Sequence, residues 1–236
     1  MKITMLGSVI LVAAVFASPA ADAGEREKSS RCKTTDSACV RFENLVQAEQ
    51  YGQVVKELDP SAQYSAGARQ FIGQAYLGLA ASETNTPEQE EAYCRKAIEV
   101  GAVQGYMGLY FIHAQKDGEK ALGFLRQYVA TKPGDSVPYV ILGESELNKK
   151  NYRQADLYLR EAKRVSSAHS SRVDWMLFQA NYLLGNYAFA GEMFESALAN
   201  GKFEQEVKEL STDERFQGIE KRPEFRKLLT ATRAES

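Results

Sequence analysis

Cysteines carry the most reactive side chains in this 236-residue chain, and two of its three cysteines are close in sequence. Cys32 and Cys39, in "RCKTTDSAC", enclose a short polar loop. A redox-active pair needs Cys-x-x-Cys, and haem attachment needs a His directly after such a pair; neither pattern occurs. The spacing instead predicts a local disulfide, which would contribute roughly 2–3 kcal/mol in the chain-entropy picture. Cys94, in "EAYCRKAIEV", falls within a predicted helix, and we expect a free, buried thiol there.

The other residues that could do chemistry do not form a recognisable set. The chain has two histidines, His113 and His169, and neither belongs to a His-x-x-His or His-Glu pattern, so we predict no metal site and no cofactor. Gly-x-Ser-x-Gly is absent, and no glycine-rich phosphate loop follows a predicted strand. The carboxylates of "EQEEAY" and "ESELNKK" fit solvated helix surfaces. We predict no catalytic residues, and keep as a third hypothesis an enzyme that loses its activity on His113→Ala.

Composition narrows the classes of partner. The chain is 44% hydrophobic, which is enough for a sizeable core. Its 29 basic and 31 acidic residues give a formal net charge of −2, without a run of Lys or Arg. Nucleic-acid binding needs a clustered basic excess, so we predict no nucleic-acid partner.

The N-terminal residues 1–23 read as a signal peptide. Lys2 precedes the apolar run "ITMLGSVILVAAVFA", and "ADA" ends at Ala23. An uncleaved membrane anchor is the alternative. No cysteine stands at a lipoprotein position. We expect a periplasmic or secreted protein with no membrane insertion after cleavage, in which 24–38 is a linker that contains most of the disulfide loop. An oxidising compartment of this kind favours the disulfide.

Two helical segments of the chain share one pattern. "NYRQADLYLREAK" and "NYAFAGEMFESAL" begin 35 residues apart, and each begins with Asn-Tyr. Their remaining matches are Ala155 with Ala190, Leu159 with Phe194, and Ala162 with Ala197. Gly143 would face Ala155 inside one helical hairpin, where small side chains let backbones approach closely. Almost nothing alternates as a strand would, so the chain is predicted to be all-α.

This pattern resembles the tetratricopeptide repeat (TPR) family, whose unit is a pair of helices of about 34 residues. The match is strongest over 139–167, and 174–202, 104–133 and 69–101 follow it less closely; 91–110 also has partial Sel1-like character. Val40 to Pro60 resembles a degenerate first hairpin, with Tyr51 at the start of its second helix. The resemblance implies a right-handed superhelix (α-solenoid) of roughly five hairpins over 39–202. Residues 203–236 resemble a C-terminal cap, with Phe203, Phe216 and Phe225 covering the last hairpin.

The resemblance also implies a binding groove lined by the first helix of each pair. The groove residues that it predicts are Gln74, Leu77, Leu109, Ile112, His113, Glu144, Leu147, Asn148, Trp175, Gln179, Tyr182 and Leu183. Trp175 and Tyr182 are the expected contact anchors. A clamp for a C-terminal carboxylate is disfavoured because this wall has hardly any basic residues. Intramolecular packing is the alternative account of several of these positions.

The expected function is therefore a non-catalytic protein–protein interaction module, or scaffold, of a bacterial cell envelope, holding a segment of a protein or peptide partner in the groove. The alternative is a self-assembling structural or assembly-factor subunit of an envelope machine for secretion, pilus assembly or polysaccharide export. A homo-oligomer is left open on either interpretation.

Overall fold

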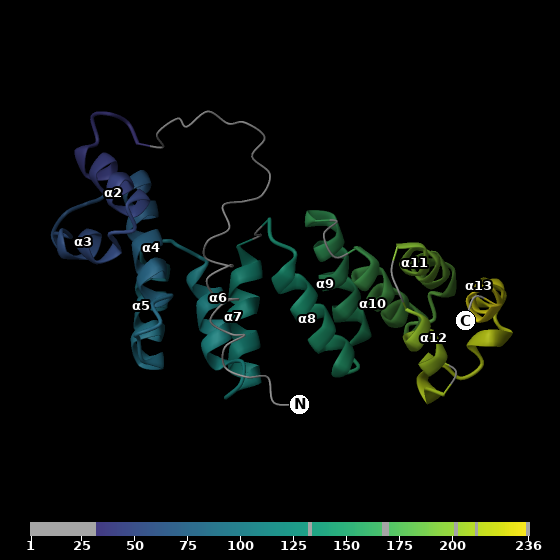
Figure 1. Ribbon diagram of the computed structural model, residues 1–236. Coiled ribbons are helices and arrows are strands. Elements are labelled where there is room, and N and C mark those ends of the chain that lie inside the picture. Colours follow the sequence, from purple (N-terminus) through teal and green to yellow (C-terminus); the bar gives the residue numbers. More distant parts are fainter. Residues whose placement is uncertain (1–31, 132–133, 167–169, 201–202, 211, 235–236) are drawn as a thin grey trace. The chain divides into compact units, whose positions relative to one another are not determined.

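The computed structural model describes residues 32–131, 134–166, 170–200, 203–210 and 212–234 (Figure 1). The chain divides into two compact units between Thr131 and Lys132, a boundary that lies inside the region predicted as one repeat domain. Residues 1–23, predicted as a signal peptide, lie outside the described ranges, as does the linker up to residue 31. No helix in the described ranges is long and apolar enough to cross a membrane.

The first unit consists of helices packed against their neighbours in the chain. They are α2 (Ser37–Gln47), α3 (Tyr51–Lys56), α4 (Ala66–Ala80), α5 (Pro87–Glu99), α6 (Gly105–His113) and α7 (Gly118–Ala130). The short pair α2 and α3 packs on α4, and α4 with α5 and α6 with α7 form successive antiparallel pairs. Tyr51 begins α3, as expected for the second helix of a degenerate hairpin.

The second unit adds two longer hairpins and a set of shorter C-terminal elements. They are α8 (Val137–Asn148), α9 (Tyr152–Val165), α10 (Ser170–Leu183), α11 (Tyr187–Asn200), α12 (Glu204–Leu210), the 3₁₀ turns η1 (Glu214–Phe216) and η2 (Ile219–Lys221), and α13 (Pro223–Ala234). Helix α10 packs against both α9 and α11, and α13 returns to pack on α11. The all-α prediction is confirmed for the described residues, which contain no strand.

Local sequence explains where several helices begin. The side chains of Ser65 and Asp117 accept hydrogen bonds from the backbone N–H groups three residues on, which caps α4 and α7. At α5, Thr86 and Gln89 form a reciprocal capping box, and Pro87 occupies the first helical position. Each device satisfies backbone donors that a helix start would otherwise leave unpaired.

Three hairpins turn in the same way. The residue in the turn adopts the left-handed conformation, with φ of 56° at Glu49, 63° at Lys150 and 82° at Gly185. In each turn the next backbone N–H donates to the carbonyl oxygen five residues earlier: Gln50 to Leu45 (2.8 Å), Asn151 to Glu146 (2.8 Å) and Asn186 to Asn181 (2.9 Å). This bond ends the first helix and reverses the chain into the second.

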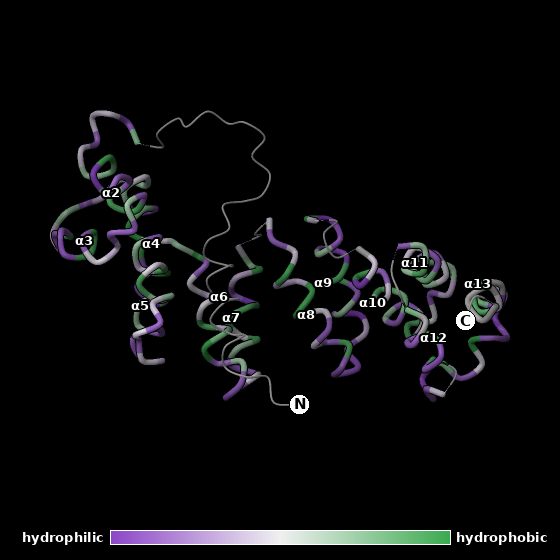
Figure 2. The backbone as a smooth tube through the Cα atoms, viewed as in Figure 1, coloured by the Kyte–Doolittle hydropathy of each residue, from purple (hydrophilic) through white to green (hydrophobic). Residues whose placement is uncertain are grey.

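Small residues occupy the contacts within helix pairs. A Cβ atom on Gly143 would lie 2.7 Å from the Leu159 side chain, so α8 and α9 could not remain this close with any larger residue there. Ala155 and Ala162 are fully buried in α9, and Ala190 and Ala197 are fully buried in α11. Figure 2 shows the consequence, with hydrophobic and hydrophilic residues alternating along each helix. The helices are amphipathic, and their apolar sides meet.

Candidate functional site

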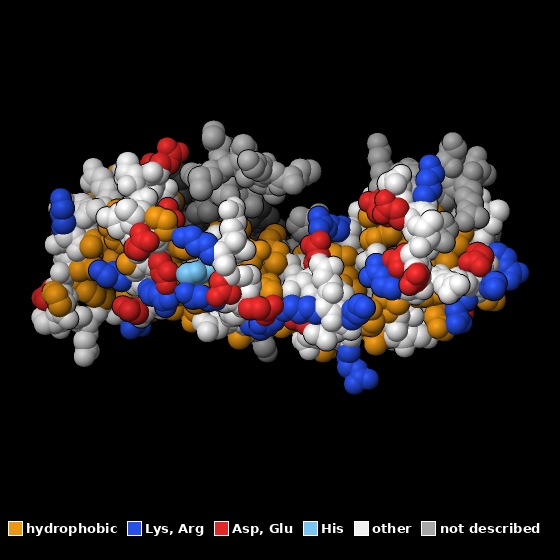
Figure 3. Space-filling model, turned by 90° about the horizontal axis from the view of Figure 1, so that it is seen from below, with side chains coloured by type: hydrophobic (Ala, Val, Ile, Leu, Met, Phe, Trp, Pro, Cys, Tyr) orange, Lys and Arg blue, Asp and Glu red, His pale blue; other side chains and the backbone are white. Residues whose placement is uncertain are grey.

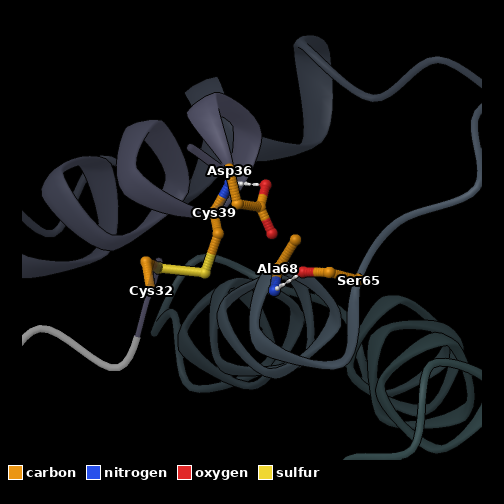
Figure 4. Close-up of a disulfide and its surroundings, with 5 residues drawn as sticks. All are labelled: Cys32, Asp36, Cys39, Ser65 and Ala68. Carbon is orange, nitrogen blue, oxygen red and sulfur yellow. Dashed lines mark hydrogen bonds between the residues drawn. A yellow bond between two sulfur atoms is a disulfide. The ribbon is translucent and has the colours of Figure 1, made fainter. Parts of the chain in front are cut away.

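A disulfide joins Cys32 to Cys39, as predicted (Figure 4). Cys39 is in the first turn of α2, where its backbone N–H donates to Asp36 Oδ1 at 3.0 Å. The pKa of the Asp36 carboxyl is lowered, mainly by its interaction with the Ser65 hydroxyl and to a smaller degree by the hydrogen bond from the Cys39 N–H. Ser65 also accepts from the Ala68 N–H at the start of α4. Disulfides persist in oxidising compartments, and this bond fits an extracytoplasmic protein.

The predicted groove residues of the first unit lie on α4 and α6. The Gln74 and Ile112 side chains are half-buried, whereas Leu77, Leu109 and His113 are buried. Leu109 belongs to a small core with Cys94 of α5, so its burial is explained by packing between helices. Gln74 is different, because its amide has no hydrogen-bond partner in residues 32–131.

The predicted groove residues of the second unit lie on α8 and α10. Asn148 is exposed, Gln179 and Leu183 are half-buried, and Leu147 is buried. The remaining one, Glu144 of α8, accepts two hydrogen bonds of 2.9 Å from Arg172 of α10. This exposed ion pair connects the first helices of two successive pairs. The amides of Asn148 and Gln179 make no hydrogen bond within the described part of this unit. Polar groups available to a partner therefore remain on both helices.

Trp175 and Tyr182, the expected anchors, are both only 7% exposed. The Trp175 ring stacks on Phe203, with centroids 4.9 Å apart and planes 6° apart. The Tyr182 ring packs at 5.1 Å from Phe216 and at 5.5 Å from Phe225. These aromatic partners come from the C-terminal segment, which covers the last hairpin. Packing within the chain accounts for the burial of both rings without a partner protein.

His113 lies at the end of α6 in a polar contact with α5. Its Nε2 is 3.1 Å from Glu91 Oε2, but the two atoms do not meet the geometry of a hydrogen bond, and this buried nitrogen has no hydrogen-bond partner among the described residues. The His113 ring packs against Phe124 of α7 at 5.6 Å. Glu91 is also hydrogen-bonded to Arg95, which is the main cause of its lowered carboxyl pKa. The cluster connects three consecutive helices. His169 lies outside the described residues, and the described ones contain no group of three His, Cys, Asp or Glu side chains placed to hold a metal.

Cys94 is free and buried, as expected, with 1% of its surface exposed. Burial, reinforced by the charges of Glu90 and Glu91, raises the pKa of its thiol to about 12. The thiolate is the reactive form of cysteine, so this side chain is inert at neutral pH.

A buried carboxylate connects three helices of the second unit. Asp174 of α10 is 1% exposed and accepts from Lys163 Nζ of α9 and from Ser196 Oγ of α11, each at 2.6 Å. Hydrogen bonds from two elements compensate for the loss of water around the charge. This network fixes the register of α9, α10 and α11.

A cavity in the second unit was not anticipated from the sequence. It has a volume of about 630 Å³ and is open to solvent. Its lining comes from α9, the end of α10, the turn between α10 and α11, the start of α11, and α13: Arg160, Asn181, Gly185, Asn186, Tyr187, Ala188, Phe189 and Glu224. Leu157, three residues before Arg160, is an apolar residue that falls off the buried Ala155, Leu159 and Ala162 face of α9, and it is 54% exposed.

No protein-family model matches the chain, and no curated protein matches it. The fold and the side-chain geometry therefore carry the functional assignment. On the face drawn in Figure 3, acidic and basic side chains of the described residues are interspersed in each unit. That distribution differs from the clustered basic surface that binds nucleic acid.

Proposed function

We propose that this protein is an exported, non-catalytic interaction module built from TPR-like hairpins, and that it binds a segment of a protein partner. The recurrent turn at Glu49, Lys150 and Gly185 supports a repeat, because the same backbone conformation ends the first helix of three pairs; it occurs once more at Gly101, between α5 and α6. The close contact at Gly143 supports the TPR resemblance in particular. The disulfide supports export to the periplasm or beyond the cell.

The amides on the first helices carry the binding part of the proposal. Gln74, Leu109, Glu144 and Gln179 follow one another at 35-residue intervals and thus occupy one position of the repeat. The amides of Gln74 and Gln179 are half-buried and have no hydrogen-bond partner in the described structure. An amide that is partly removed from water and unbonded gains most when a partner backbone supplies the missing donor and acceptor. Extended peptides offer such groups at regular spacing.

Replacing the amide at this position by a positively charged side chain tests the proposal. We would fix the protein to a matrix and measure recovery of envelope proteins by Gln74→Arg and Gln179→Arg, with Gln127→Arg on the exposed side of α7 as the matched control. We expect a specific partner recovered by the wild type and by the control to fall at least tenfold with either wall variant. Equal recovery by all four proteins would show that the wall does not bind.

A further inference from the structure

The cavity of the second unit contains an arginine whose position is fixed. Arg160 Nε lies 2.9 and 2.8 Å from the two carboxylate oxygens of Asp156, one turn earlier on α9. The guanidinium carbon lies 4.1 Å from the ring centroid of Phe189 on α11, close enough for a cation–π contact. The Nη1 and Nη2 groups donate no hydrogen bond to any described residue. Arg160 is therefore held by its Nε and its flat face, and the NH₂ groups remain available.

Two asparagines, linked by hydrogen bonds, fix the position of the Asp156 carboxylate that binds Arg160. Asn181 is fully buried, and its Nδ2 donates to Asp156 Oδ1 at 2.6 Å and to the Leu177 carbonyl at 3.0 Å. The Asn181 Oδ1 accepts in turn from Asn186 Nδ2 at 3.2 Å. Each member fixes the next, so Arg160 loses little conformational freedom when it binds a ligand. A bidentate carboxylate is the group that matches two adjacent guanidinium NH₂ groups.

The exposed large apolar side chains of the unit are close in sequence to residues that line this cavity. Leu157, at 54%, and Leu184, at 36%, are the large hydrophobic residues that the described structure leaves exposed. Leu157 is three residues before Arg160 and shares its side of α9. Leu184 directly precedes Gly185 of the cavity lining. A ligand that places a carboxylate on Arg160 therefore meets apolar surface next to it.

Glu224 sets a limit on the charge of the ligand. It belongs to the lining through α13, and its carboxylate has no ion pair or hydrogen bond to a described residue. Arg160 is the one basic residue among the lining residues, so a first carboxylate gains its guanidinium, whereas a second would find no cation in the lining and would add to the repulsion from Glu224. One carboxylate among apolar residues fits this surface better than an acidic run.

We propose that this cavity is a second binding site, separate from the first-helix wall, that takes an internal peptide segment with a single acidic side chain flanked by leucine-like residues. Arg160 binds the carboxylate, Asp156 and Asn181 position the guanidinium, and Leu157 and Leu184 contact the flanking side chains. Asn186 Oδ1 accepts from the peptide backbone.

A peptide titration with the full chain tests this site. The probe is a fluorescein-labelled, C-terminally amidated heptapeptide with one Glu at its centre and Leu two positions away on each side; a second peptide has Gln in place of Glu, and a third has three Glu. Anisotropy at low ionic strength should show the single-Glu peptide binding at least fivefold more tightly than either of the others. Arg160→Gln should remove the preference for Glu over Gln. Arg164→Gln, one turn further along the same helix and outside the cavity, should keep it.

Two further measurements make the outcome decisive. Leu157→Ser is expected to weaken the single-Glu and Gln peptides by a similar factor, because it removes apolar contact and not charge. Thermal unfolding confirms that each variant is folded. The site is ruled out if the wild type binds neither peptide or binds both equally, or if folded Arg160→Gln retains the preference. Concentration-dependent dimerisation that Leu157→Ser abolishes would also overturn it, by assigning this surface to a second copy of the chain.

Discussion

Trp175 and Phe203 stack face to face, with ring centroids 4.9 Å apart. Trp175 is the only tryptophan of the chain, so tryptophan emission reports on the surroundings of this one ring, which include Phe203. We predict that Phe203→Ala shifts the emission maximum to longer wavelength, because water reaches the indole, and lowers the free energy of unfolding by about 1–2 kcal/mol. Phe124→Ala, in the first unit, is the control and should leave the emission maximum unchanged. An unshifted spectrum for Phe203→Ala would mean that the C-terminal segment does not cover Trp175 in solution.

The pair formed by Lys163 and Asp174 should be costly to break from one side. Lys163→Met leaves the buried Asp174 carboxylate with the Ser196 hydroxyl as its one remaining partner. We predict that it lowers the free energy of unfolding by about 1–3 kcal/mol, which is less than for a fully buried ion pair because the lysine itself is partly exposed. The double variant Lys163→Met/Asp174→Leu should recover most of this lost free energy of unfolding, since no charge remains buried. Urea unfolding measures all three values. Arg164→Met, whose partner Glu161 is exposed, should change stability by less than about 0.5 kcal/mol; an equal loss there would contradict the role given to burial.

Much of the helical framework could be predicted because it depends on local pattern. Small residues at helical spacing identify the hairpins, and the contact between Gly143 and Leu159 shows why a small residue is required there. The disulfide followed from two nearby cysteines and a proposed export signal. The break between Thr131 and Lys132 could not be read in the same way, because consecutive repeat-like segments look alike in sequence whether or not they form one compact unit.

Side-chain environments created by distant segments could not be predicted to the same degree. Position in the repeat assigned Trp175 and Tyr182 to a groove wall. The expected cap placed Phe203, Phe216 and Phe225 over the last hairpin, but neither expectation said that these rings would pack on Trp175 and Tyr182. The cavity at Arg160 likewise depends on α9, α10, α11 and α13 meeting, and its residues are 64 positions apart from Arg160 to Glu224. Tertiary packing, which a repeat pattern does not specify, decided both cases.

The recurrent turn should respond in opposite ways at two of its positions. Lys150 has φ of 63°, a conformation that costs a residue with a Cβ about 1 kcal/mol, so Lys150→Gly should raise the free energy of unfolding by a few tenths to about 1 kcal/mol. Gly185 has φ of 82°, which glycine adopts without strain, and Gly185→Ala should lower the free energy of unfolding by about 1 kcal/mol. Chemical denaturation of the two variants measures the signs. The same sign for both would show that the turns are not equivalent.

The Asp36 carboxylate predicts a pH dependence of stability. Its pKa is lowered in the folded state by the hydrogen bonds with Ser65 and Cys39, so it stabilises the fold above its unfolded pKa of about 4 and ceases to do so as pH falls through its folded pKa. Asp36→Asn retains a capping side chain but not the charge. We expect a melting temperature below that of the wild type at pH 7, and a difference that narrows as the pH falls below about 4. Melting curves that stay parallel from pH 7 to pH 3 would exclude this contribution.

The three cysteines predict a stepwise thiol titration. Native protein at pH 8 should not react with Ellman's reagent, because burial raises the pKa of Cys94 to about 12 and leaves roughly one thiolate in ten thousand, shielded from the reagent. Unfolding in guanidinium without a reductant should release one thiol per chain, since Cys32 and Cys39 remain bonded. Unfolding after reduction should release all three. Cys94→Ala is the control, with no reactive thiol until reduction. Three thiols in the unreduced, unfolded protein would mean that the disulfide does not form, and rapid labelling of the native chain would mean that α5 opens readily enough to expose Cys94.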